Sequence, residues 1–227
     1  MKKIISIMML MIISLSVYAN DIYINQSGAT LDLDVLQDGQ NNTIGSSGTA
    51  SSVIGATTNL AITQIGDSNV MTFDVNGATY TGTFSVTGNS NNIDFNCDSQ
   101  GTNSSCGTAT ASIVWVGSSN DIDIDIGETS SATGATVSIT GASGSDSNTV
   151  LGTIDGNSAI LTLSINGDTN NFLVDIDGNG DSVGHTYVHT HTGSIADVDI
   201  TQSGIYDNMI TLTTSGDNHD IDIIQRD

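Results

Sequence analysis

The chain has 227 residues, no proline, 25 glycines, and 25 acidic against 3 basic residues. Two of the basic residues open the chain before an apolar run that ends at Ala19, which is the pattern of a secretory signal peptide over residues 1–19. Residues 20–227 then carry a net charge of −24, because Arg226 is their one basic residue. This charge excludes nucleic acid and anionic membranes as partners, and no second apolar stretch is long enough for a membrane span. We expect one secreted domain, extracellular or at the cell surface.

Apolar residues alternate with polar ones along most of residues 20–227, which predicts short β-strands with one buried face. Helix signals are missing. The inward candidates, in chain order, are Ile22, Ile24, Gln26; Leu31, Leu33, Val35, Gln37; Ile62, Gln64; Phe73, Val75; Phe84, Val86; Ile93, Phe95; Ile113, Trp115; Ile122, Ile124, Ile126; Val137, Ile139; Leu161, Leu163, Ile165; Phe172, Val174, Ile176; Val198, Ile200, Gln202; Ile210, Leu212; and Ile221, Ile223, Gln225.

Glycines recur every 11 residues between these strands, as at Gly66, Gly77 and Gly88, and an Asn often follows three residues later. A unit of two strands and two turns is then about 22 residues long, and units of this length stack on one another. We therefore expect an all-β solenoid of roughly six or seven coils, rather than a β-sandwich. Residues 45–58, 99–108 and 128–134 interrupt the period and are expected to bulge as loops.

Several segments share a pattern of Gln, one residue, Gly, and then Asn: Gln37-Asp-Gly39 with Asn42, Gln64-Ile-Gly66 with Asn69, and Gln202-Ser-Gly204. Together with Gln26-Ser-Gly28, they resemble the curlin repeat of curli, the bacterial functional amyloid. The resemblance covers the first unit, the unit at Leu60 and the last units well, and the middle by length and glycine spacing alone. It implies that residues 20–227 form a solenoid that stacks within and between subunits into extracellular fibres for adhesion or biofilm. The residues expected to form stacking ladders are Gln26, Gln37, Gln64 and Gln202, with Asn42, Asn69, Asn91 and Asn170 at the turns.

Neither end of the repeat region shows a polar capping unit, so head-to-tail stacking on itself or on related fibre subunits is expected. The outward positions of many strands are Asp, as at Asp32, Asp34, Asp220 and Asp222. Charges on edge strands oppose pairing. We therefore expect assembly to be slow in low salt and faster in high salt or with divalent cations.

A calcium site is one open alternative. Asp175, Asp177, Asn179 and Asp181 alternate as in the first half of an EF-hand-type loop, but Thr186 stands where the closing Glu is needed. The competing interpretation is a strand with outward Asp residues. The same choice applies to Asp121, Asp123 and Asp125. We expect no required cofactor, and calcium is the one metal ion that these aspartates suggest.

His185, His189 and His191 share one parity on a strand over residues 186–192. Structural zinc usually needs four ligands and no Cys is nearby, so an exposed polar strand is the preferred interpretation. Cys97 and Cys106, the two cysteines, are expected to form a disulfide across a polar insertion.

The residues do not favour an enzyme, because no triad stands out and an acidic-sugar lyase would need basic residues that this chain lacks. A monomeric calcium-dependent adhesin or surface-layer component is the main alternative to the fibre. Ice binding is a further one, suggested by Thr186, Thr190 and Thr192 and by Thr211 and Thr213. In the sequence, however, these threonines do not recur in each coil.

Overall fold

The computed structural model describes residues 21–226 except 40, 46–49, 67, 89, 98–105, 118–119, 128–133, 143–146, 157–158, 178–184 and 205–207. The expected signal peptide lies outside these residues. The strands are β1 (Asp21–Ile22), β2 (Asn25–Asp38), β3 (Thr43–Ile44), β4 (Ser51–Ile65), β5 (Val70–Thr87), β6 (Asn92–Cys97), β7 (Cys106–Val116), β8 (Asp121–Ile126), β9 (Gly134–Gly141), β10 (Asn148–Asp155), β11 (Ile160–Asn166), β12 (Asn170–Asp177), β13 (Thr186–Thr192), β14 (Ala196–Ser203), β15 (Met209–Ser215) and β16 (His219–Arg226).

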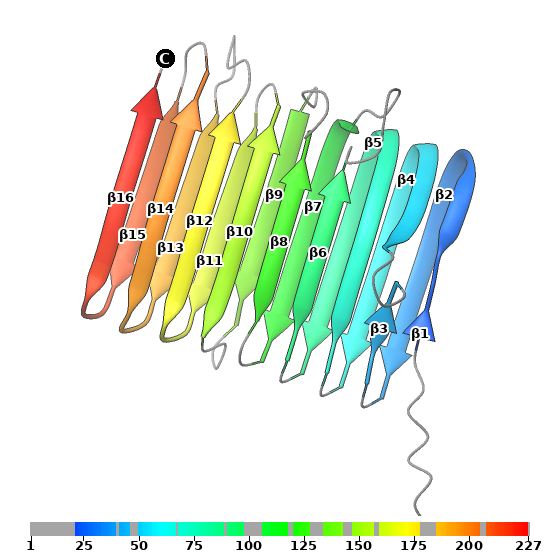
Figure 1. Cartoon of the computed structure of the whole chain (residues 1–227), viewed down its shortest axis with the longest axis horizontal. Coiled ribbons are helices and arrows are strands. Elements are labelled where there is room, and N and C mark those ends of the chain that lie inside the picture. Colours follow the sequence, from blue (N-terminus) through cyan, green and yellow to red (C-terminus); the bar gives the residue numbers. More distant parts are fainter. Residues whose placement is uncertain are drawn as a thin grey trace, which may run out of the picture.

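The strands stack in two layers that share one core (Figure 1). Layer I contains β1, β3, β6, β8, β10, β12, β14 and β16, together with the first parts of β2, β4 and β5. Layer II contains the second parts of β2, β4 and β5, followed by β7, β9, β11, β13 and β15. Every strand pair in the described part of the chain is parallel and joins one coil to the next. The predicted all-β solenoid is confirmed.

The coil length varies more than the glycine period suggested. Paired residues are 22 apart at Val70 and Asn92, but 27 apart at Thr30 and Thr57 and 29 apart at Thr79 and Thr108. Residues 51–58, expected in a loop, belong to β4, and residues 106–108 belong to β7, so both predictions are wrong there. The rest of the expected insertion at 99–105 lies outside the described residues.

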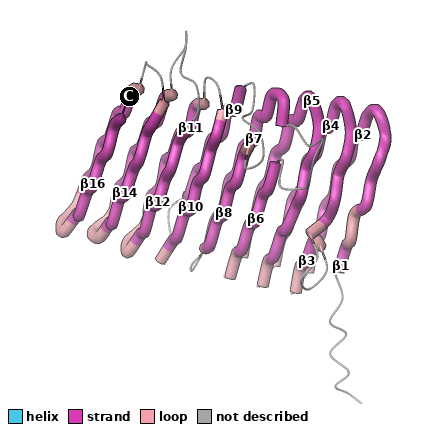
Figure 2. Tube along the Cα trace, turned by 45° about the horizontal axis from the view of Figure 1, so that its top comes forward, coloured by secondary structure: helices cyan, strands magenta, loops and turns pink. Residues whose placement is uncertain are grey.

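The three long strands β2, β4 and β5 bend from layer I into layer II without a break (Figure 2). Glycine allows the close stacking at this bend: a Cβ atom on Gly77 would lie 2.1 Å from the carbonyl oxygen of Gly55 in the coil before it. Two glycines that were expected in turns, Gly28 and Gly77, are therefore inside strands. These glycines recur along the sequence because they occupy the bend between layer I and layer II.

The core is filled by the inward residues of both layers. The alternation predicted from the sequence holds in the interior coils, where Phe73, Trp115 and Ile176 are at most 1% exposed. Aromatic rings pack across the two layers, with the Tyr80 and Phe95 centroids 5.1 Å apart and the Phe73 and Phe84 centroids 6.1 Å apart. Burial of this continuous apolar column stabilises each coil through its neighbours. No helix of membrane-spanning length and hydrophobicity occurs among the residues that the structure describes.

Candidate functional site

A buried row of asparagine amides runs along the solenoid, at the position that directly precedes β3, β5, β6 and β8 and begins β10 and β12. Asn69 Nδ2 donates to Asn42 Oδ1 (2.7 Å), Asn120 donates to Asn148 (2.7 Å), and Asn148 donates to Asn170 (2.6 Å). Asn91 also donates to Asn120. All six amides are at most 4% exposed. The predicted residues Asn42, Asn69, Asn91 and Asn170 thus lie in one row with Asn120 and Asn148. The row is hydrogen-bonded in two segments, Asn42 with Asn69 and Asn91 through Asn170.

The ladder changes direction in its middle. Asn69 donates toward the N-terminal end of the stack, whereas Asn91 donates toward the C-terminal end. The side-chain oxygens of these two residues are buried without a hydrogen-bond partner. Several ladder amides also hold the preceding turn, since Asn120 donates to the carbonyl oxygen of Gly117 (2.8 Å) and Asn170 to that of Gly167 (2.6 Å). The ladder therefore fixes the turns to the stack.

Glutamine forms two shorter ladders. Gln64 Nε2 donates to Gln37 Oε1 (2.8 Å) in layer II, and Gln225 donates to Gln202 (3.2 Å) in layer I. Gln26 does not stack on another glutamine within the chain, because its register partner is Val53. A glutamine ladder at Gln26 therefore stays a prediction for contact between subunits. Gln225 was placed on the inward face but was not expected in a ladder.

Register partners through layer I nevertheless connect Gln26 to Gln225. The column of inward side chains that begins at Gln26 continues through Val53, Val75, Cys97, Ile126, Ile154, Ile176 and Gln202 and ends at Gln225. Ile22 and Ile221 are likewise the first and last members of a single column. The two ends of the stack therefore present the same side chains at equivalent positions.

The end coils leave inward apolar side chains only partly covered. Ile22, Leu33 and Ile221 are half-buried, and Ile223 is 44% exposed, whereas Ile200 in the adjacent coil is 1% exposed. Among the described strands, β1 and β2 at one end and β15 and β16 at the other pair on one edge only. Both ends are therefore apolar and have unpaired backbone edges, which are templates for a further strand.

Outward aspartates cover layer I. Burial raises the pKa of Asp94, and the neighbouring carboxylates of Asp74, Asp125 and Asp121 raise it further. Asp175 behaves similarly, because burial and the nearby Asp177 raise its pKa. Burial is the larger cause of both shifts, and repulsion among like charges on this sheet face adds to it. The members of this acidic face are Asp74, Asp94, Asp121, Asp123, Asp125, Asp155, Asp175, Asp177, Asp197, Asp199, Asp220 and Asp222.

The residues of the expected calcium loop are only partly described. Asp175 and Asp177 point outward on β12, and the Ser203 hydroxyl donates to Asp177 (2.9 Å). Asn179 and Asp181 lie outside the described residues. Across the described part of the chain, no group of three or more His, Cys, Asp or Glu residues could hold a metal ion.

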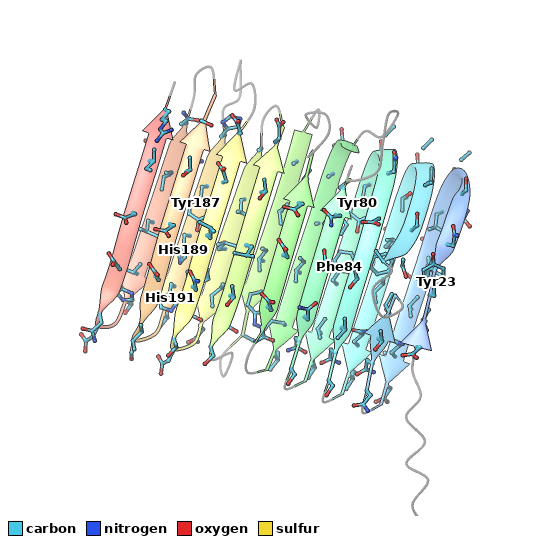
Figure 3. The ribbon with its side chains drawn as sticks, viewed as in Figure 1. Tyr23, Tyr80, Phe84, Tyr187, His189 and His191 are labelled. Carbon is cyan, nitrogen blue, oxygen red and sulfur yellow. The ribbon has the colours of Figure 1, made fainter. Side chains whose placement is uncertain are left out.

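The histidines of β13 face the core, so their interpretation as an exposed polar strand is wrong. His189 and His191 are 0% exposed and lie in line with Tyr187 (Figure 3), and His185, directly before β13, is also 0% exposed. Tyr187 Oη and His189 Nδ1 are 2.7 Å apart, and His191 Nε2 lies 2.9 Å from the carbonyl oxygen of Gly167 and 2.7 Å from Asn170 Nδ2. Phe172 of layer I packs edge-on against the His189 ring, with centroids 4.7 Å apart. Burial lowers the pKa of His189 to about 4, so this imidazole is neutral at pH 7.

Cys97 is buried in β6 and is disulfide-bonded. The sequence has one other cysteine, Cys106, at the start of β7. Both strands pair with β5, one in each layer. Residues 98–105, between these two strands, lie outside the described residues.

No protein-family model, curated protein or solved structure matches this chain. Interpretation of the candidate site therefore rests on its own geometry. Its two chemical features are the matched ends of the stack and the amide ladders within it. Both features favour the association of β-strands, and neither contains a chemically reactive side chain.

Proposed function

We propose that this protein is a secreted, curlin-like structural protein that assembles end to end into extracellular fibres for adhesion or biofilm. The observation that carries this proposal is the equivalence of Gln26 and Gln225, which occupy the two ends of one column. A second subunit stacked in register on β16 would place its Gln26 on Gln225 and its Ile22 on Ile221. The ladder of Gln202 and Gln225 would then continue across the junction, as amide ladders do in stacked β-structures.

Burial of apolar side chains favours this junction. Ile221 and Ile223 would gain the cover that Val198 and Ile200 already have one coil further inside. Such a contact is heterologous, with one end binding the other, and it repeats without closing. Open filaments are the expected product.

Charge opposes the same junction. Asp21 and Asp220 lie at the two ends of another layer I column, so stacking in register brings two carboxylates onto adjacent strands. Adjacent strands are about 4.8 Å apart, and the Debye length falls from about 8 Å at 0.15 M salt to about 3 Å at 1 M. Salt and divalent cations should therefore accelerate assembly.

We expect the purified protein to form fibres after a lag that shortens several-fold between 0.05 and 1 M NaCl, because screening weakens the repulsion. Thioflavin T fluorescence and electron microscopy measure this. Gln225→Glu should lengthen the lag strongly, since it places a carboxylate in the column that meets Gln26. Thr201→Glu adds the same charge on the outer face one coil inside and should change the lag much less. A protein that stays monomeric at every salt concentration, or equal effects of the two variants, would contradict end-to-end stacking.

A further inference from the structure

Layer II carries aligned rows of hydroxyl side chains on its outer face. Thr57, Thr79 and Thr108 are register partners on β4, β5 and β7, and all three are exposed. A second exposed row contains Thr81, Thr110 and Thr136, and a third contains Ser164, Thr190 and Thr213. The outward residues of the layer II strands (the second parts of β4 and β5, then β7, β9, β11, β13 and β15) form the hydroxyl face.

The rows could not be found from a fixed period, because the coils between them differ in length. Thr30, Thr57, Thr79 and Thr108 are successive register partners, yet they are separated by 27, 22 and 29 residues. Threonine rows therefore recur over three or four successive coils, although none continues through every coil: Thr108 is followed by Gly134 and Thr136 by Ile160. Strand register aligns residues that the sequence spacing leaves out of phase.

Charge is segregated between the two layers. The described layer II strands from β4 to β15 contain no Asp, Glu, Lys or Arg, whereas layer I carries the acidic face. Tyr80 and Tyr187 point into the core, so the hydroxyl face also presents no aromatic ring in this part of the chain. An uncharged face without aromatic rings does not suit an ionic partner or the stacking of sugar rings.

Within each row the hydroxyl groups are held at regular spacings, although apolar residues such as Ile160 and Val188 interrupt the rows. Strands in a sheet are about 4.8 Å apart, and alternate residues along one strand are separated by about 6.7 Å. Threonine is restricted at χ1, so its hydroxyl and methyl groups lose little freedom on binding. Repeats of this size are close to oxygen repeats in the lattice of hexagonal ice. The ordered water that such an array holds can therefore join a growing crystal face.

We propose that the hydroxyl face binds ice. The occupant is crystalline water, since the face offers hydroxyls and methyls in rows, lacks charge, and is rigid through its parallel hydrogen bonding. Assembly into fibres uses the ends of the stack and leaves this face open, so the two activities are independent.

Thermal hysteresis and the shaping of ice crystals test this proposal on the full protein, kept at low ionic strength where assembly is slow. The wild-type protein should shape crystals and show hysteresis. Thr110→Tyr and Thr190→Tyr each place a bulky ring in the centre of an exposed row, and together they should remove most of both effects. Thr153→Tyr makes the same change on the outward face of layer I and should leave both effects unchanged.

Circular dichroism and the fluorescence of the buried Trp115 check that each variant is folded. Absence of hysteresis and crystal shaping in the folded wild-type protein would overturn the proposal. So would an equal loss in Thr153→Tyr. If the wild-type protein instead sediments as a dimer and the face variants sediment as monomers, the face binds a second copy of the chain and the ice proposal is wrong. None of these results depends on whether fibres form.

Discussion

Replacing Asn170 with alanine will lower the free energy of unfolding by about 3 kcal/mol, because it removes buried hydrogen bonds and leaves the Asn148 amide without its acceptor. Asn170 accepts from Asn148 (2.6 Å) and donates to the carbonyl oxygen of Gly167 (2.6 Å), and it is 4% exposed. The loss falls on both strand stacking and the turn before β12. Urea denaturation followed by Trp115 fluorescence measures the difference.

The neighbouring residue supplies the matched control. Asn171 is exposed on the same strand, and Asn171→Ala should change the free energy of unfolding by less than about 0.5 kcal/mol. Both variants are the same Asn→Ala substitution on the same strand, so the change in intrinsic strand propensity is the same in each. Similar small losses in the two variants would show that the asparagine ladder does not stabilise the solenoid.

Much of this fold could be predicted from the sequence because strand alternation is a local property. In β8, Ile122, Ile124 and Ile126 alternate with aspartates, and the structure buries the isoleucines and leaves the aspartates on the outer face. Most of the asparagine ladder could also be predicted from the sequence, since Asn69 and Asn91 each follow a glycine by three residues. Asn148 has Ser145 at that place, so the glycine rule missed it. Its position directly before an alternating strand was the remaining signal.

Register could not be predicted, because it depends on loops of unequal length. It decides that Gln26 meets Val53 rather than a glutamine, and that Thr79 and Thr108 are adjacent. The orientation of β13 was misjudged for a different reason. Residue polarity suggested an exposed strand, but parity with Tyr187 already placed His189 inward, and a neutral imidazole is acceptable in a core when a hydroxyl pairs with it.

The buried histidine should make the protein less stable in mild acid. The pKa of His189 falls from 6.5 to about 4 in the folded state, since burial is its largest cause and His191 and His219 add to it. Above pH 6.5 both states are neutral and the contribution to stability is complete. Between pH 6.5 and 4 only the unfolded chain binds the proton, so the free energy of unfolding falls by roughly 3 kcal/mol in total.

Other titrating groups lie around His189 and must be separated from it. Tyr187 and His191 share its strand, His219 approaches from β16, and Asp168 raises the pKa of His191. The raised pKa values of Asp94 and Asp175 act in the opposite direction, because their protonation in acid stabilises the folded state. A comparison of variants therefore isolates the histidine better than one pH profile.

The double variant Tyr187→Phe with His189→Leu should lose this acid dependence. Leucine suits the site because the register partners of His189 are Leu163 and Leu212. Tyr187→Phe alone removes the same hydroxyl, keeps the imidazole, and should still lose stability as the pH falls. Urea midpoints at pH 7, 5.5 and 4.5 measure both variants. If the double variant loses as much stability in acid as Tyr187→Phe, His189 does not set the acid limit of the solenoid.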